Sequence, residues 1–196
     1  MMWRAISVRP YLKVEHFVGS VERLAWAKAN GCPWVARTCA NVALCGQLVM
    51  LQWARELGCP WDAATCSFAS WIGHPAVLKW AREQDCTWDT FTCLFAAYGG
   101  HLAVLTWARE NSCPWDANTC KYAALGGHLE VLKWAREHQC PWDHWTCRNA
   151  VERWLPESVE LLRWAREHGA PWDAATRDLA ATRGYTDDFP LSPPEN

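Results

Sequence analysis

The sequence has no uninterrupted apolar run close to the roughly 18 residues that a membrane-spanning helix requires. It also has no excess of positive charge. The 19 Lys and Arg residues against 21 Asp and Glu give a formal net charge of −2, which disfavours nucleic acid or an acidic membrane as a partner. Residues 1–19 lack the continuous apolar stretch and the small-residue cleavage site of a secretory signal. We therefore expect an intracellular protein, cytoplasmic or nuclear, that binds neither membranes nor nucleic acids.

Two further absences narrow the class of protein. No stretch alternates polar and apolar residues over a useful length, so the pattern does not require strands. No phosphate-binding loop, no nucleophile–histidine–acid order and no unique acid–base pair stands out. The sequence therefore predicts an all-α protein that is not an enzyme and has no catalytic residues, no cofactor and no metal site.

Tryptophan and cysteine are abundant instead, with 16 and 11 copies. The string Cys-Pro-Trp-Asp, or a near copy, begins at positions 32, 59, 86, 113, 140 and 170, so the copies are 27, 27, 27, 27 and 30 residues apart. A second marker, Trp-Ala-Arg or Trp-Ala-Lys, begins at positions 26, 53, 80, 107, 134 and 164 with the same spacings. A repeat of this length is typical of a solenoid or propeller, in which each unit buries its apolar face against its neighbours.

One unit shows the local structure that is repeated. Asp116 stands where an N-cap would accept hydrogen bonds from the first turn of a helix. The apolar positions that follow it have the i, i+3, i+4 spacing of one helical face: Cys120, Ala123 and Ala124. The glycines at 126–127 supply the positive φ that ends a helix, a second helix is expected from about residue 128 to 138, and Pro141 stops it. Each unit is therefore predicted to be a helical hairpin, and the chain holds about five to six of them.

The two ends of the chain depart from the repeat. Residues 1–19 are expected to form an N-terminal capping segment, with 11–18 in the place of a first helix. Residues 20–184 hold the solenoid, and the Pro-rich residues 185–196 are expected to be a disordered tail. Three extra residues around 153–157 are expected to lengthen the loop between the two helices of their unit.

Residues 123–133, Ala-Ala-Leu-Gly-Gly-His-Leu-Glu-Val-Leu-Lys, resemble the segment Ala-Ala-x-x-Gly-His-Leu-Glu-Val-Val-Lys of the ankyrin repeat family. Residues 96–105 show the same register, and 69–78 show it less closely. The period is 27 rather than about 33 residues, and the missing residues fall where the ankyrin β-turn finger would lie. The chain thus resembles a short, Trp-rich ankyrin variant without the finger. The resemblance implies an all-α, ankyrin-like solenoid with degenerate end caps that binds another protein on its concave face, and we expect a monomer.

The invariant ladders are interpreted as structural. A Trp at the same place in every unit is expected to pack between repeats in the core, because large rings dominate burial energetics. The Arg-Glu column, which begins at Arg55-Glu56, is expected to form a solvated outer face with weak ion pairs.

The cysteines allow several interpretations. Five pairs are seven residues apart, and Cys45 is left over: Cys32/Cys39, Cys59/Cys66, Cys86/Cys93, Cys113/Cys120 and Cys140/Cys147. Equivalent Cys residues of stacked helices are about 8–10 Å apart, too far for a disulfide, which leaves pairing within a unit or diagonally between units. Reduced thiols that pack as small hydrophobes fit an intracellular protein better. Zinc bound with the His column at 74, 101 and 128 is disfavoured, because structural zinc sites use closer Cys spacing.

Columns that vary between the units are free to serve a partner. They lie at the start of the first helix, after the second Cys and at the end of the first helix, which lines the concave side of an ankyrin-like stack. The candidate partner-binding residues are Phe91, Trp145, Leu94, Tyr98, Trp71, Lys121, Arg148 and His144. The predicted function is a non-enzymatic protein–protein interaction module whose partner is another protein. The alternative is a structural protein whose paired Cys residues bind metal or respond to redox.

Overall fold

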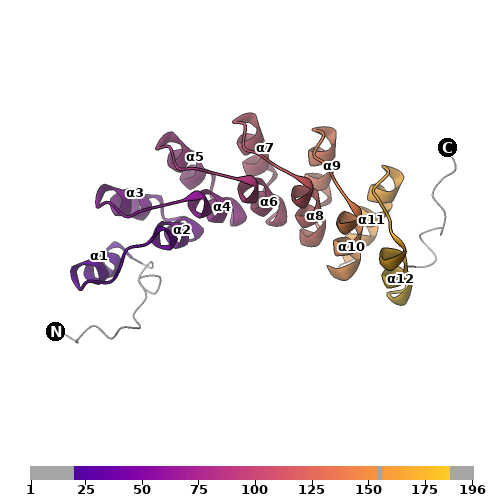
Figure 1. Ribbon diagram of the computed structural model, residues 1–196, viewed down its shortest axis with the longest axis horizontal. Coiled ribbons are helices and arrows are strands. Elements are labelled where there is room, and N and C mark those ends of the chain that lie inside the picture. Colours follow the sequence, from indigo (N-terminus) through magenta and orange to yellow (C-terminus); the bar gives the residue numbers. More distant parts are fainter. Residues whose placement is uncertain (1–19, 154–155, 186–196) are drawn as a thin grey trace. The chain divides into compact units, whose positions relative to one another are not determined.

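The computed structural model describes residues 20–153 and 156–185. In that part of the chain it contains twelve helices and no strand, which confirms the all-α prediction (Figure 1). The helices are α1 (Val21–Ala29), α2 (Ala36–Leu44), α3 (Leu48–Glu56), α4 (Ala63–Trp71), α5 (Pro75–Glu83), α6 (Thr90–Tyr98), α7 (Leu102–Glu110), α8 (Ala117–Gly126), α9 (Leu129–Glu137), α10 (His144–Arg153), α11 (Pro156–Glu167) and α12 (Ala174–Thr182). The predicted capping segment, 1–19, lies outside the described residues. The predicted tail also lies outside them except for its first residue, Tyr185, which is buried.

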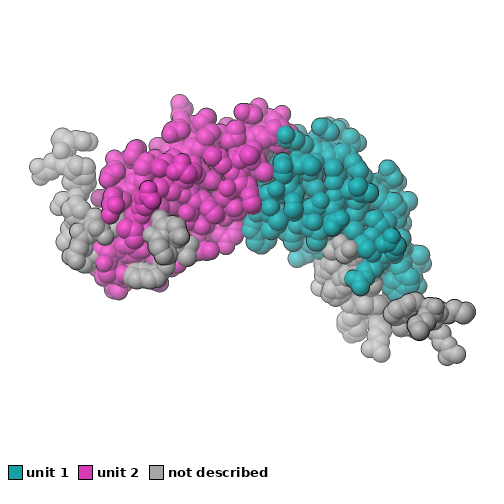
Figure 2. Space-filling view, turned by 180° about the vertical axis from the view of Figure 1, so that it is seen from behind, with its two compact units in different colours: residues 1–88 teal, residues 89–196 magenta. Residues whose placement is uncertain are grey.

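The helices belong to two compact units, Met1–Trp88 and Asp89–Asn196 (Figure 2). In the first unit α2 and α3 form one hairpin, α4 and α5 form the next, and α2 packs against α4. In the second unit α6, α8, α10 and α12 pack against one another in chain order, and α7, α9 and α11 each fold back on the helix before them. We call the even-numbered helices first helices and the odd-numbered ones second helices. Each unit is a stack of hairpins in which the first helices form the main packing layer, as a helical solenoid requires.

Aspartates cap the first helices from α4 onward, as predicted, whereas Val35 stands at this position before α2. The Asp116 carboxylate accepts a hydrogen bond from the Asn118 N–H at 2.9 Å, and Asp62 and Asp89 accept the equivalent bonds at 3.0 Å. Gly127 follows α8 in the left-handed region, with φ 79°, which confirms the predicted end of that helix. The repeated Asp and Gly positions therefore set where the helices begin and end.

Small and aliphatic side chains make up the core. Every second helix contributes a Leu with no exposed surface: Leu24, Leu51, Leu78, Leu105, Leu132 and Leu162. The first helices contribute Ala residues and a Thr-Cys pair, such as Thr119 and Cys120, that is also fully buried. These short side chains let neighbouring first helices approach closely.

The three extra residues of the penultimate unit lie in a helix. Helix α11 has twelve residues, whereas the second helices α1, α3, α5, α7 and α9 have nine each. Between α10 and α11 only residues 154–155 intervene. The prediction of a longer loop is therefore wrong, because the insertion adds close to one turn at the start of α11.

Histidine and glycine of successive hairpins interlock beside the turns. The His128 Nε2 atom lies 3.1 Å from the carbonyl oxygen of Tyr98 in the preceding hairpin. Gly100 has φ 75°, and a Cβ atom there would lie 2.6 Å from the His128 ring. In the first unit, a Cβ atom at Gly46 would likewise lie 2.5 Å from the His74 ring. Glycine is thus needed for its backbone conformation and for this close approach.

Burial lowers the pKa of His128, against a smaller opposing effect of its hydrogen bond to the Tyr98 carbonyl. Because the folded state favours the neutral ring, unfolding takes up a proton as the pH falls below about 6.5. The stability that His128 contributes is complete above that pH and is lost as the pH falls through the lowered pKa. We therefore expect the difference in unfolding free energy between wild type and His128→Gln, measured by urea denaturation, to be larger at about pH 7.5 than at about pH 5. A difference that stays constant or grows on acidification would contradict this assignment.

Candidate functional site

The repeated tryptophans form pairs that are half-buried. Trp115 of one Cys-Pro-Trp turn packs edge-on against Trp134 of α9 with ring centroids 6.0 Å apart, and Trp61 packs against Trp80 in the same way at 5.7 Å. Trp26 is 40% exposed. The rings do pack in every hairpin, but the prediction that they form the core is wrong, since shorter side chains fill the core.

From α3 onward, the repeated arginine of each second helix reaches to the turn that follows it, and Lys28 takes this place in α1. The Arg109 guanidinium lies over the Trp115 ring, 4.3 Å from its centroid, and its Nη1 donates a hydrogen bond to the Cys113 carbonyl. Arg55 repeats both contacts in the first unit, with Trp61 and Cys59. The prediction that this column only forms weak ion pairs in solvent is wrong for the arginines, which link each second helix to the next turn.

The cysteines meet at a spacing of 20 residues, not seven. The Cys39 thiol lies 3.9 Å from the Cys59 carbonyl oxygen, and the thiols of Cys93 and Cys120 lie 4.0 Å from the carbonyl oxygens of Cys113 and Cys140. In these pairs, and in Cys66/Cys86, the two thiols also lie close enough to shift each other's pKa. This is the diagonal arrangement between neighbouring hairpins. All eleven thiols are free, and all but Cys45 are buried. In the part of the chain that is described, no group of three or more His, Cys, Asp and Glu side chains is placed to hold a metal ion. The metal or redox alternative is not supported.

Two hollows open between neighbouring second helices. The hollow in the second unit has a volume of about 590 Å³, and repeated residues line it, among them Glu110, Trp115 and Trp134. The hollow in the first unit has a volume of about 530 Å³ and is lined by the equivalent residues Glu56, Trp61 and Trp80. The same repeat positions line both hollows. They are therefore a consequence of the repeat and do not distinguish one unit from another.

Seven of the eight candidate partner-binding residues belong to the second unit, and Trp71 belongs to the first. Phe91 and Trp145 stand at the second position of α6 and α10 and are 53% and 39% exposed. Leu94 is only 5% exposed, so the prediction that it lies on the surface is wrong. Lys121 and Arg148, at the equivalent position of later helices, are half-buried because their long side chains carry the charge past the packed region.

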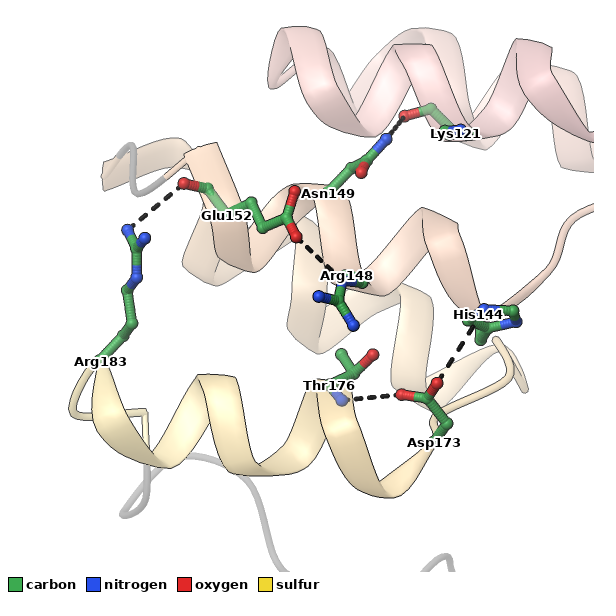
Figure 3. Close-up of polar contacts among 8 residues, drawn as sticks. All are labelled: Lys121, His144, Arg148, Asn149, Glu152, Asp173, Thr176 and Arg183. Carbon is green, nitrogen blue, oxygen red and sulfur yellow. Dashed lines mark hydrogen bonds and ion pairs between the residues drawn. The ribbon is translucent and has the colours of Figure 1, made fainter.

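Three of the candidates, Lys121, His144 and Arg148, surround Trp145. The Lys121 Nζ atom and the Arg148 guanidinium each lie 5.2 Å from the centroid of the Trp145 ring, and the His144 ring lies 5.1 Å from it. Arg148 also forms an ion pair with Glu152 at 2.9 Å (Figure 3). The structure thus brings together three basic side chains around one exposed indole.

Polar contacts fix the backbone beneath this cluster. The Asn149 Nδ2 donates to the Lys121 carbonyl at 3.4 Å and so ties α10 to α8. On the other side, His144 lies 3.9 Å from the Asp173 carboxylate, which caps α12 by accepting from the Thr176 N–H at 2.7 Å (Figure 3). The positions of the basic side chains are therefore set by three neighbouring first helices.

Two aromatic residues extend the cluster toward α6. Tyr122 lies 5.6 Å from the Lys121 ammonium and packs edge-on against Tyr98 at 5.9 Å, and Phe95 packs against Phe91 at 6.1 Å. Sequence reasoning missed Tyr122 and Phe95. The equivalent positions of the other repeats hold Phe68 and Asn149, so this position also varies between repeats. A comparison of the repeats could therefore have identified both residues. We call Phe91, Phe95, Tyr98, Lys121, Tyr122, His144, Trp145 and Arg148 the first-helix patch.

No family model matches the sequence, and no curated protein matches it either. Among solved structures, the human ASB11 ankyrin repeat domain is similar, with a TM-score of 0.52 and 18% identity over 67% of this chain and 69% of that chain. This chain has an ankyrin-like repeat fold. A second similar structure, the pentatricopeptide repeat protein PPR10 in complex with an 18-nt psaJ RNA element, has a TM-score of 0.42 and 14% identity over 92% of this chain and 34% of that chain. The chain therefore spans about a third of PPR10.

Within the described residues of this ankyrin-like chain, none of the helices is both long enough and apolar enough to cross a bilayer. The human domain shows the fold alone at 18% identity.

The arginine contact can be tested in the second unit. Arg109→Ala removes a cation–π contact and a charge-assisted hydrogen bond to a turn carbonyl, so we expect a loss of about 1–3 kcal/mol of unfolding free energy in urea denaturation. The neighbouring exposed Glu110→Ala is the matched control and should change stability by less than about 0.5 kcal/mol. Equal effects of the two substitutions would contradict the structural role of the arginine.

Thiol reactivity tests the cysteine arrangement. Burial raises the pKa of Cys147 to about 12, and the hydrogen bond to the partner thiol together with burial raises the pKa of Cys39, Cys93 and Cys120. We expect an aromatic disulfide reagent at neutral pH to modify one thiol rapidly, that of Cys45, and the other ten only on unfolding. Cys45→Ser should abolish the rapid phase and Cys147→Ser should leave it unchanged. Several rapid equivalents in the folded protein would show that the buried pairs are accessible.

Proposed function

We propose that this protein is a non-enzymatic interaction module that binds another protein through the first-helix patch of its second unit. The observation that carries the proposal is the exposure of two large aromatic side chains, Phe91 at 53% and Trp145 at 39%. The equivalent positions of α8 and α12 hold Asn118 and Ala175, so the repeat itself does not require an aromatic residue there.

The chemistry of the patch supports binding. Exposed aromatic residues beside arginine or lysine are the typical anchors of protein interfaces, because they bury a large area with few rotatable bonds. Trp145 has this environment, with Lys121 and Arg148 both 5.2 Å from its ring. The ankyrin-like fold supports the same class of function, since repeat solenoids present extended surfaces for partners.

The proposal includes a cellular location, the class of partner and the oligomeric state. The eleven free thiols favour a reducing compartment, so we propose an intracellular location in the cytoplasm or nucleus. The formal net charge of −2 disfavours nucleic acid as the partner. The chain is proposed to act as a monomer that offers the patch to a different protein.

The proposal is tested by quantitative affinity capture from the native cell. Partners of the wild type should be reduced at least about tenfold with the double variant Phe91→Ala/Trp145→Ala, because each lost anchor costs on the order of 1–2 kcal/mol. The matched control is Val49→Ala/Leu57→Ala, which removes two exposed apolar side chains outside the patch, 73% and 44% exposed. Circular dichroism and thermal melting confirm that both variants remain folded. Partners retained by the patch variant, or lost equally with the control, would refute the assigned surface.

A further inference from the structure

The charges of the first-helix patch differ in how they are compensated. Arg148 has Glu152 at 2.9 Å, and His144 has Asp173 at 3.9 Å. For Lys121 the contacts are aromatic: its ammonium lies 5.2 Å from the Trp145 ring centroid and 5.6 Å from that of Tyr122. No carboxylate of the described residues forms an ion pair with it. One half-buried cation is therefore left to a partner, beside the exposed indole of Trp145.

A cation in this position favours a particular kind of ligand. A carboxylate that approaches Lys121 also approaches the indole of Trp145, which is 39% exposed. An aromatic side chain next to that carboxylate can pack against the exposed part of the indole, while the ammonium keeps its contact with the ring. Farther along the patch, Phe91 offers a second apolar anchor on α6.

We propose that the first-helix patch takes a peptide segment of the partner in which an acidic residue adjoins an aromatic one. The acidic side chain pairs with Lys121, and the aromatic side chain packs on Trp145. This inference rests on the proposed function, since it names the chemistry of the segment that the patch recognises.

The same side chains fit a single-stranded RNA less well. Base stacking on Trp145 would bring several phosphates to α8 and α10, and each needs a cation. Among the residues that the structure describes, Lys121 is the one cation of the patch whose charge no carboxylate offsets. The carboxylates of Asp89, Asp116 and Asp143 cap the helices of this face, and those of Asp89 and Asp143 accept hydrogen bonds from the N–H groups of Phe91 and Trp145 themselves. These carboxylates repel the several phosphates of a bound strand more strongly than they repel a single carboxylate placed at Lys121.

The test uses the full chain and defined polymers. A fluorescently labelled random copolymer of glutamate and tyrosine is titrated with the protein at physiological ionic strength, and binding is followed by fluorescence anisotropy. The comparison probes are polyglutamate, which lacks the aromatic group, a copolymer of lysine and tyrosine, which reverses the charge, and polyuridylate. We expect the glutamate–tyrosine copolymer to bind at least about fivefold more tightly than any of the other three.

Two substitutions and a matched control locate the binding. Lys121→Glu and Trp145→Ala should each weaken binding of the glutamate–tyrosine copolymer by about fivefold or more. Lys133→Ala removes a lysine that lies on second helix α9 and pairs with Glu130 at 2.9 Å, and should change binding less than about twofold. Lys121→Arg, which keeps the charge, should retain binding.

Several results would overturn the inference. Equal affinity for polyglutamate would remove the aromatic component, and preference for the lysine copolymer would remove the charge component. Tighter binding of polyuridylate that depends on Lys121 and Trp145 would make the patch a nucleic-acid surface. If capture of a cellular partner depends on Phe91 and Trp145 while the glutamate–tyrosine copolymer fails to bind, the proposed function stands and this inference fails. If the copolymer binds through Lys121 while the Phe91→Ala/Trp145→Ala variant still captures the cellular partners, the proposed function fails instead.

Discussion

The carbonyl of the cysteine in each Cys-Pro-Trp turn is the point on which the repeat depends. The Pro that follows it has no N–H and a fixed φ, so the turn is rigid but supplies few hydrogen bonds of its own. The structure supplies them from the preceding hairpin: Arg55 donates to the Cys59 carbonyl, and the Cys39 thiol lies 3.9 Å from the same oxygen. The guanidinium that makes this bond also covers Trp61. A 27-residue unit can thus join its neighbours through side chains at one turn, without the additional turn of a longer ankyrin repeat.

The local elements of the fold could be predicted because their causes lie within a few residues of one another. An Asp N-cap, a helical stripe and a closing Gly, as in 116–127, are all short-range signals. The contacts that join hairpins could not be predicted in the same way, because their partners do not lie on one helix face. Arg55 meets Trp61 across a helix end and a turn, and Cys39 meets Cys59 at 20 residues rather than seven. Which residues of neighbouring hairpins meet can be known only from the way in which the hairpins stack.

The candidate site was predicted in part, for a reason visible in one column of the repeat. Leu94, Lys121 and Arg148 occupy equivalent positions of α6, α8 and α10. A leucine there ends inside the main packing layer and is 5% exposed, whereas the longer cationic side chains reach the ring of Trp145. A comparison of the repeats shows that the residue type varies at this position but not how far each side chain extends. All three residues were therefore predicted to lie on the binding surface. Phe91 and Trp145 were found because their column has small or polar counterparts.

The location of the repeated Arg, Trp and Cys contacts explains why the residues at the start of the first helix can differ from one hairpin to the next. The Arg, Trp and Cys contacts that join hairpins involve the second helices, the turns and the buried side of the first helices. Phe91 and Trp145 stand outside these contacts, at helix starts already capped by Asp89 and Asp143. A change at either aromatic position leaves the cap, the core Leu and the turn carbonyl in place. The side chains that stabilise each hairpin are therefore not the ones proposed to bind a partner, and a chain of nearly identical hairpins can present one surface that is not repeated.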